Sequence, residues 1–278
     1  MSGERCRIGV VAPASRVSPE VAASVPALAA RLYPERTPEI IFHPQCFASH
    51  GHFAGDDDAR AQAFLDIAND ESYDAVWFAR GGYGSCRVVE SIMSRLTPAS
   101  RRKAYVGYSD AGMLLAALYR AGFTAVAHGP VAQDILRSGG DAAVARALAW
   151  MIDRGAEALE PTVDGKKKTA AFNMTVLSHL LGTPLEPRLD GHVLMLEEVG
   201  EAMYRIDRSL FHITGNANVR RVSGIMLGRC SNITPNEPDF GMNEEDIAQY
   251  WCRRAGIAWL GRADIGHDSN NKIVPFGP

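Results

Sequence analysis

Residues 73–85 read YDAVWFARGGYGS, and this stretch decides the fold class. Its first seven residues are mostly apolar, as is typical of a strand buried in a sheet. The next six residues contain three glycines, and a helix-like stretch, VVESIMSRL, follows at 88–96. A buried strand, a glycine-rich turn and a helix in this order predict one unit of an α/β fold.

The same order of elements repeats on both sides of this stretch. Further strands are predicted at residues 7–12, 40–43, 104–106 and 125–127. Further helices are predicted at residues 18–33, 59–69 and 111–122. Repeated strand–helix units favour a mostly parallel sheet flanked by helices, of the flavodoxin-like kind, with functional loops at the carboxyl ends of the strands.

The second half of the chain predicts a smaller unit. Residues 154–169 are polar and contain Pro161, Gly165 and three consecutive lysines, a composition typical of a linker. We therefore expect an N-terminal α/β domain over residues 1–153 and a C-terminal α/β or β-rich domain over residues 170–278. In the C-terminal domain, strands are expected at residues 192–198 and 223–229, and helices at residues 176–182, 203–214 and 244–256.

Composition excludes several classes of protein. The net charge is −3, which argues against a nucleic-acid binder that relies on a broad basic face. The five cysteines are scattered without a CxxC pair, so neither a zinc ribbon nor a redox dithiol is expected. The N-terminus shows no signal-peptide pattern and no apolar run is long enough to span a bilayer. A cytoplasmic protein without metal, cofactor or membrane contact is expected.

The stretch Gly107-Tyr108-Ser109-Asp110 carries the candidate nucleophile. It lies between a short apolar strand and a helix, where a sharp turn lifts a serine out of the sheet. The motif GxSxG is not matched. The alternative is that Ser109 or Asp110 caps the free N–H groups of the following helix.

The turn Arg80-Gly81-Gly82-Tyr83-Gly84-Ser85 is a candidate binding loop. Adjacent glycines let backbone N–H groups approach a phosphate or the oxyanion of a tetrahedral intermediate. The loop lacks the Lys-Ser/Thr of a P-loop, and a plain tight turn is the alternative. Arg80 is a candidate partner for a substrate carboxylate, or else a member of a structural ion pair. With Gly81 and Tyr83 it completes the candidate substrate-binding set.

A serine nucleophile needs a histidine base and an acid that orients it. Glu197 and Glu198 end the apolar strand HVLML, and His267 lies in the polar loop GHDSNN near the C-terminus. Solvated carboxylates and a surface histidine are the alternatives. His128 follows another strand and is expected to support the site rather than to react.

Taken in order, these motifs resemble the LD-carboxypeptidase family of serine peptidases, which includes murein tetrapeptide carboxypeptidases and microcin C immunity-type peptidases. The similarity runs through IGVVAPAS, GHFAGDDDARAQAF, RGGYGSCRVV, VGYSD, HGP, LLGTPLEP, HVLMLEEVGEAMYRIDRSL and GHDSNNKIVPFG, which together cover nearly the whole chain. Two departures are visible. Ala171-Phe172-Asn173 replaces a family pattern of two glycines before an asparagine, and relatives usually continue into another strand beyond Pro278, so an edge element could be absent.

The resemblance implies a catalytic triad of Ser109, Glu197 and His267, with Glu198 and Glu201 as rivals for the acid. It implies an oxyanion hole formed by the backbone N–H groups of Gly82 and Asp110, with Gly81 as a local rival. It further implies release of the terminal D-alanine from a murein tetrapeptide and a homodimer. A peptidyl-nucleotide peptidase is the nearest alternative, and a phosphate or nucleotide binder using RGGYGS is the contrasting one.

Overall fold

The structure is a computed structural model that describes residues 5–278. Residues 1–4, the start of the stretch searched above for a signal peptide, lie outside the described residues. The first sheet of the described chain contains β1 (Arg7–Val11), β2 (Glu39–Phe42), β3 (Ala75–Phe78), β4 (Ala104–Gly107), β5 (Val126–His128) and β10 (Val274–Pro275). The second contains β6 (Lys168–Asn173), β7 (His192–Val199), β8 (Gly224–Ser231) and β9 (Trp259–Arg262).

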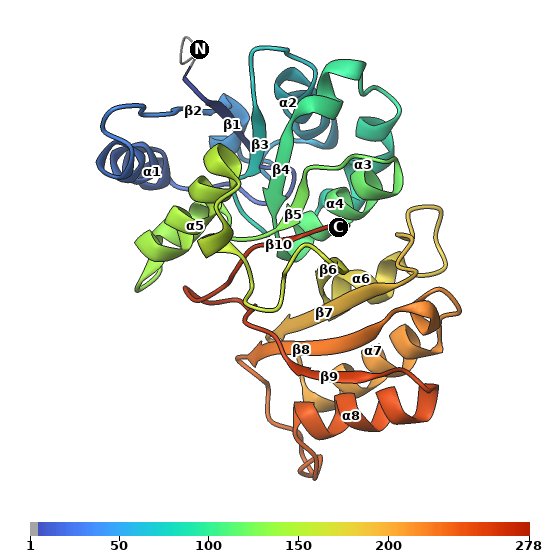
Figure 1. Ribbon diagram of the computed structural model, residues 1–278. Helices are drawn as coiled ribbons and strands as arrows, with labels where there is room; N and C mark the ends of the chain where they lie inside the picture. The colour runs from blue at the N-terminus through green and yellow to red at the C-terminus, as the bar shows by residue number, and fades with distance from the viewer. Residues whose placement is uncertain (1–4) are drawn as a thin grey trace.

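Helices cover both sheets (Figure 1). The α-helices of residues 5–278 are α1 (Pro19–Leu32), α2 (Asp57–Ala68), α3 (Ser85–Met93), α4 (Gly112–Arg120), α5 (Gly140–Asp153), α6 (Met174–Leu180), α7 (Met203–Gly215) and α8 (Glu244–Ala255). Short 3₁₀ turns are η1 (Pro44–Phe47), η2 (Pro98–Arg102), η3 (Ser109–Ala111), η4 (Ala132–Leu136), η5 (Ala156–Ala158) and η6 (Val219–Arg221).

The first sheet has the strand order β10-β5-β4-β3-β1-β2, and its first five strands in sequence are parallel. This is the flavodoxin-like order 2-1-3-4-5 extended by one antiparallel strand. Helices α1 and α5 pack on one face, and α2, α3 and α4 on the other (Figure 1). Because both faces are covered, β3 and β4 are buried along their whole length.

The second sheet has the order β6-β7-β8-β9 and is also parallel. Helices α6, α7 and α8 pack on one of its faces (Figure 1). The other face carries a small apolar cluster that includes Met195, Ile265 and Val274. The predicted fold class, a mostly parallel sheet with a second, smaller α/β unit, is confirmed.

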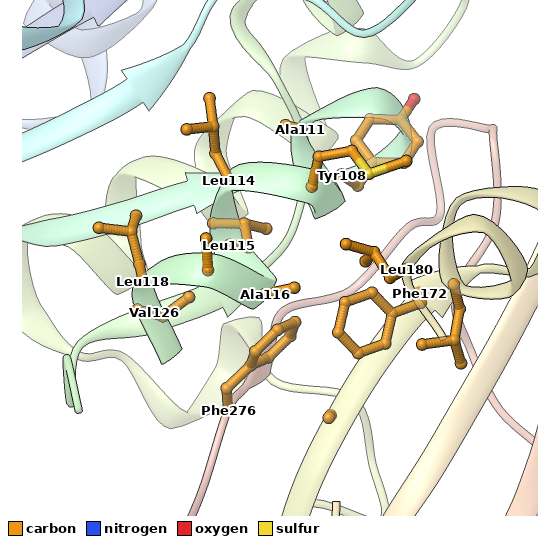
Figure 2. Close-up of a cluster of buried hydrophobic side chains, with 14 of the residues drawn as sticks. Tyr108, Ala111, Leu114, Leu115, Ala116, Leu118, Val126, Phe172, Leu180 and Phe276 are labelled. Carbon is orange, nitrogen blue, oxygen red and sulfur yellow. The ribbon is translucent and has the colours of Figure 1, made fainter. Parts of the chain in front are cut away.

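The two sheets share one hydrophobic core. Phe172 of β6 and Leu180 of α6 lie in the same cluster as Leu114 of α4 (Figure 2). Phe276, near the end of the chain, joins this cluster, and its ring centroid lies 5.0 Å from that of Phe172. Burial of this apolar surface holds the carboxyl edge of the first sheet against the second sheet.

One helix and three strands were not indicated by the sequence, namely α5, β6, β9 and β10. Strand β10 pairs with β5, so the end of the chain returns to the first sheet instead of staying on the second. Strand β6 begins at Lys168, inside the predicted linker. The division at residues 153 and 169 stays a prediction about folding units. Among the helices of residues 5–278, none has the length and apolar character needed to cross a bilayer.

Candidate active site

Ser109 lies at the sharp turn that was predicted from its sequence context. Tyr108 alone separates it from the buried strand β4, and its backbone φ is 61°, in the left-handed region that residues other than glycine rarely adopt. Such a conformation costs about 1–3 kcal/mol and is kept where the surrounding structure requires it, often at active sites. The turn leaves Ser109 partly exposed at the carboxyl edge of the sheet.

The alternative role of this turn, as a cap of its own helix, is wrong. No side chain caps the start of η3 or α4. The Asp110 carboxylate instead accepts hydrogen bonds from the N–H groups of Gly84 (3.2 Å) and Ser85 (2.9 Å), at the start of α3. Asp110 is buried, so this contact fixes the glycine-rich loop to the Ser109 turn.

The glycine-rich loop needs its glycines for two different reasons. Gly82 has a φ of 115°, which only glycine adopts without strain, and a Cβ there would lie 2.6 Å from Ser15 Oγ. At Gly81, a Cβ would lie 2.9 Å from Ser109 Oγ, so the backbone approaches the hydroxyl closely. Within the described chain, the N–H groups of Gly82 and Asp110 donate no hydrogen bond to a protein group.

A cavity of about 770 Å³ lies where the carboxyl edges of the two sheets meet. Gly82, Tyr83 and Ser109 line it from the first sheet, and Asn173 and Glu198 from the second. Residues 171–173 differ from the family pattern of two glycines before an asparagine. Of these three residues only Asn173 lines the cavity, because the side chains of the other two are buried in hydrophobic clusters.

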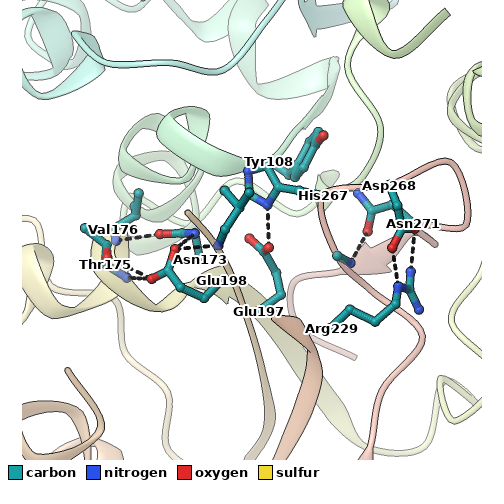
Figure 3. A network of polar contacts seen from close by, with 12 residues as sticks. Tyr108, Asn173, Thr175, Val176, Glu197, Glu198, Arg229, His267, Asp268 and Asn271 are labelled. Carbon is teal, nitrogen blue, oxygen red and sulfur yellow. Dashed lines mark hydrogen bonds and ion pairs between the residues drawn. The ribbon is translucent and has the colours of Figure 1, made fainter. Parts of the chain in front are cut away.

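His267 is paired with Glu197. The Nδ1 atom of His267 lies 2.5 Å from Glu197 Oε2 (Figure 3). The Glu197 side chain is fully buried and that of His267 is 9% exposed. A histidine whose Nδ1 is held by a carboxylate presents Nε2 as its reactive nitrogen.

The two adjacent glutamates have different surroundings because successive side chains of a strand point to opposite faces. Glu198 accepts hydrogen bonds from Asn173 Nδ2 (2.5 Å), from the N–H (2.9 Å) and hydroxyl (2.7 Å) of Thr175, and from the N–H of Val199 (2.9 Å). Both carboxylate oxygens of Glu198, which lines the cavity, therefore already accept hydrogen bonds from protein groups. The β7–β8 register shifts between Leu196 and Glu198, so Glu197 lies where the pairing of these two strands is irregular.

The carboxylates change the proton affinity of His267. Burial alone would lower the pKa of this imidazole, but the charge and hydrogen bond of Glu197, together with the charge of Glu198, raise it above its usual value. Burial also raises the pKa of Glu198, against the hydrogen bonds it accepts. His128 is fully buried, and this burial lowers its pKa to about 4. His128 is therefore neutral at pH 7.

The loop that carries His267 is held by long-range contacts. His128 Nε2 and the N–H of Gly266 both lie 3.2 Å from Asn271 Oδ1. Arg146 donates from Nε to the carbonyl of Asn271 (2.9 Å) and also contacts the carbonyl of Ser269. Arg229 forms an ion pair with Asp268 (Figure 3) and a second one with Asp264. None of these partners was predicted from sequence, except that His128 was expected to support the site.

The predicted base, His267, lies beside Tyr108, the residue that precedes the predicted nucleophile in the chain. The ring centroid of Tyr108, the residue before Ser109, lies 4.8 Å from that of His267 (Figure 3). Among residues 5–278, no protein group forms a hydrogen bond with His267 Nε2, and neither His267 nor Glu197 contributes to the wall of the cavity.

Arg80 lies apart from this group. It is exposed, donates to the carbonyl of Arg16 (3.2 Å) and does not line the cavity. Within residues 5–278 it forms no ion pair, so the structural ion pair that was its alternative role is not found. Its contact with substrate stays a prediction. No cluster of three His, Cys, Asp or Glu side chains in the described chain could hold a metal ion.

Comparisons with known proteins assign both halves of the chain to one family. Residues 8–129 match the LD-carboxypeptidase N-terminal domain, and residues 168–278 match the LD-carboxypeptidase C-terminal domain. A putative carboxypeptidase of Synechocystis is 30% identical over 86% of this chain and 79% of its own length. The murein tetrapeptide carboxypeptidase of Pseudomonas aeruginosa is 28% identical over 98% of this chain and 91% of its own.

Solved structures share the fold. A muramoyltetrapeptide carboxypeptidase from Oxalobacter formigenes superposes with a TM-score of 0.78 at 22% identity, covering 97% of this chain and 93% of that one. MccF in complex with glutamyl sulfamoyl guanosine superposes with a TM-score of 0.79 at 15% identity, covering 98% and 91%. The two matched domains span most of the sequence, and the chain therefore belongs to the LD-carboxypeptidase family of peptidases.

Proposed function

We propose that this protein is a serine-type LD-carboxypeptidase that releases the terminal D-alanine from murein tetrapeptides. One observation carries the proposal: the buried His267–Glu197 pair lies against Tyr108, which directly precedes the strained Ser109 turn. In this proposal, a hydroxyl, an imidazole and a carboxylate from three separate parts of the chain act together where the two sheets meet.

In the proposed reaction, Ser109 Oγ attacks the carbonyl carbon of the last peptide bond and His267 Nε2 takes the hydroxyl proton. Glu197 keeps the imidazole in the tautomer with a free Nε2 and stabilises the imidazolium that forms. For this step the Ser109 hydroxyl and His267 Nε2 must come within hydrogen-bond distance when substrate binds, as is common for catalytic contacts that are loose in free enzymes.

The tetrahedral oxyanion would accept hydrogen bonds from the N–H groups of Gly82 and Asp110. Both groups are unused by the described protein, and the Asp110 carboxylate ties their two loops together. Collapse of the intermediate breaks the C–N bond, and the proton on His267 passes to the leaving amine of D-alanine. Water then attacks the acyl-enzyme with His267 again as base, and Ser109 is restored.

The cavity fits a short peptide. Its volume of about 770 Å³ lies in the range of small-molecule sites. The similarity to the murein tetrapeptide carboxypeptidase of Pseudomonas aeruginosa supports the substrate class.

Two other activities remain as alternatives. MccF structures with aminoacyl sulfamoyl nucleosides share this fold and favour the peptidyl-nucleotide alternative. The phosphate-binder alternative finds less support, because four carboxylates line the cavity and, in the described chain, no lysine or arginine does. Those carboxylates belong to Glu90, Asp110, Glu198 and Glu201. The predicted homodimer and cytoplasmic location stay predictions.

Mass spectrometry of products tests the proposal. The protein is incubated with a murein tetrapeptide ending in D-alanine, the same peptide ending in L-alanine, the pentapeptide and a peptidyl-adenylate. The expected result is loss of one alanine from the D-terminated tetrapeptide alone, and no loss with Ser109→Ala. Cleavage of the peptidyl-adenylate with an intact tetrapeptide would replace the proposal by the nucleotide alternative.

A further inference from the structure

One group of side chains contacts both the loop that carries His267 and the turn that carries Ser109. We propose that Arg137, supported by Asp134 and Tyr108, is a positioning residue that aligns His267 with Ser109. This inference rests on the proposed peptidase function. It adds three residues to the reaction that neither the motifs nor the family comparison assigns.

Arg137 makes contacts in two directions. Its Nη1 donates to the backbone carbonyl of His267 (2.9 Å), and its Nε donates to Asp134 Oδ1 (2.7 Å). Its Nη2 lies 3.5 Å from the Tyr108 hydroxyl, at the limit of a hydrogen bond. One planar guanidinium therefore contacts both the residue before the nucleophile and the proposed base, a geometry for which arginine is suited and lysine is not.

Asp134 anchors this arginine. It lies in η4, after β5, and is only 2% exposed. Its Oδ1 also accepts from the Tyr108 hydroxyl (3.1 Å), and its Oδ2 accepts from the N–H of Val131 (3.0 Å). Burial raises the pKa of Asp134, opposed by its contacts with Arg137. A buried carboxylate with these partners is costly to leave unpaired, so it holds Arg137 and Tyr108 in place.

Tyr108 forms the contact with the imidazole itself. Its ring lies beside two histidines, with its centroid 4.8 Å from that of His267 and 5.6 Å from that of His128. Its side chain is 3% exposed, and its hydroxyl is fixed by Asp134. Because Tyr108 and Ser109 are neighbours in the chain, fixing this ring sets the imidazole plane relative to the nucleophile's backbone.

The charge of Arg137 also acts on His267. Several titratable or charged groups surround this imidazole: Glu197 and Glu198 of β7, Tyr108 before η3, His128 of β5, Asp134 and Arg137 at η4, and Asp268 with its partner Arg229. The two glutamates raise the pKa of His267, whereas burial and the Arg137 charge lower it. Loss of that positive charge is therefore expected to raise the pKa of His267 further.

A second arginine holds the same loop, so a purely structural role of Arg137 can be distinguished from the proposed positioning role. Arg146 donates to the carbonyls of Ser269 and Asn271, but it has no hydrogen bond to His267 or Tyr108 within residues 5–278. Arg146→Met is thus the matched control for Arg137→Met, since both remove one arginine from one loop.

The test follows the imidazole pKa by NMR of protein labelled in its histidine rings, together with kcat and KM for tetrapeptide hydrolysis. Arg137→Met is expected to raise the pKa of His267 and to lower kcat by about 10–100-fold with a smaller change in KM, as for loss of an alignment contact. Arg137→Lys should restore the pKa but little of kcat. Arg146→Met should lower the melting temperature and leave the pKa of His267 unchanged.

Tyr108 gives a second, milder series. Tyr108→Phe keeps the ring against His267 and removes only the bond to Asp134, whereas Tyr108→Leu removes the ring. Tyr108→Leu is expected to lower kcat severalfold more than Tyr108→Phe does. An unchanged His267 pKa in Arg137→Met, with kcat no lower than in Arg146→Met, overturns the proposal. The NMR titration needs no substrate, so it still gives an answer if the protein fails to cleave tetrapeptides.

Discussion

The two halves of the site are built in different ways. The Ser109 side is built from backbone: a positive φ at the serine, a positive φ at Gly82, and a close approach at Gly81. The His267 side is built from side chains, because a fully buried carboxylate holds the ring and arginines from other elements hold the carbonyls of its loop.

This difference teaches where each half is vulnerable. A backbone-built turn depends on residue types that tolerate unusual φ values, so a single methyl group can disturb it. A side-chain-built loop depends on a network of partners, so it loses alignment and changes its pH dependence when one charge is removed. Variants on the two sides should therefore fail in distinguishable ways.

The largest effect is expected when the reacting group on either side of the site is removed. Ser109→Ala and His267→Ala should each lower kcat/KM by roughly 10⁴-fold or more, because members of a triad act as a unit. Circular dichroism and melting temperature should stay near those of the unchanged protein. A residual activity within tenfold of it in Ser109→Ala would remove the serine from the reaction.

The next effect distinguishes the two glutamates. Glu197→Gln should lower kcat by about 10²–10⁴-fold, because an amide can favour the wrong imidazole tautomer. Glu198→Gln leaves the His267 contact intact and should act mainly on stability through Asn173 and Thr175. Steady-state kinetics paired with thermal unfolding separates them, and the reverse ranking in kcat would assign the acid to Glu198.

On the backbone side, Gly82→Ala should lower kcat by about 10²–10³-fold, as for loss of one oxyanion donor. The added methyl both strains the φ of 115° and meets Ser15. Ser15→Gly in the same chain is the matched rescue, since it removes the clash but not the strain. Full activity in Gly82→Ala would show that this loop does not form the oxyanion hole.

The pH dependence of kcat/KM tests the His267 side of the site, which is built from side chains. His267 must be neutral to accept a proton and its pKa is raised, so kcat/KM should fall on the acid side of a pKa above 6.5. Glu197→Gln removes a raising charge and should move this limb to lower pH. The raised pKa also stabilises the fold below pH 6.5, and that contribution is lost as pH rises through the folded-state pKa. A limb at or below pH 6.5 would contradict the pairing.

The smallest expected effect is at an ion pair remote from the site. Arg31 and Asp141 are 68% and 62% exposed, so Arg31→Met should change the free energy of unfolding by less than about 1 kcal/mol. Chemical denaturation measures this, and kcat should not change. A larger loss would mean that the packing of α1 on α5 depends on charge.

The sequence predicted the backbone-built half better than the other. A buried strand followed by glycines, or by Gly-Tyr-Ser-Asp, is a local pattern whose geometry follows from neighbouring residues. The flavodoxin-like sheet was predicted for the same reason. The short strand β10 was missed because its pairing with β5 depends on a contact between residues far apart in the chain.

The partners of His267 could not be predicted in this way. Arg146 and Arg229 contact carbonyls or carboxylates at positions more than 30 residues away, and no local pattern signals such contacts. For Asp134 and Arg137 the sequence offers one weak indication of a contact, namely an acidic and a basic residue three positions apart, shortly after His-Gly-Pro. The pattern alone predicts only an exposed helical pair, whereas the structure buries Asp134 beneath Tyr108.

The most direct test of the account is to identify the residue that carries the acyl group during turnover. Acid quenching of a reaction with murein tetrapeptide, followed by peptide mapping with mass spectrometry, should find the tripeptide ester on Ser109. The adduct should be absent in His267→Ala. An adduct on another side chain, or hydrolysis at the full rate with none on Ser109, would contradict the claim that the two halves meet around this serine.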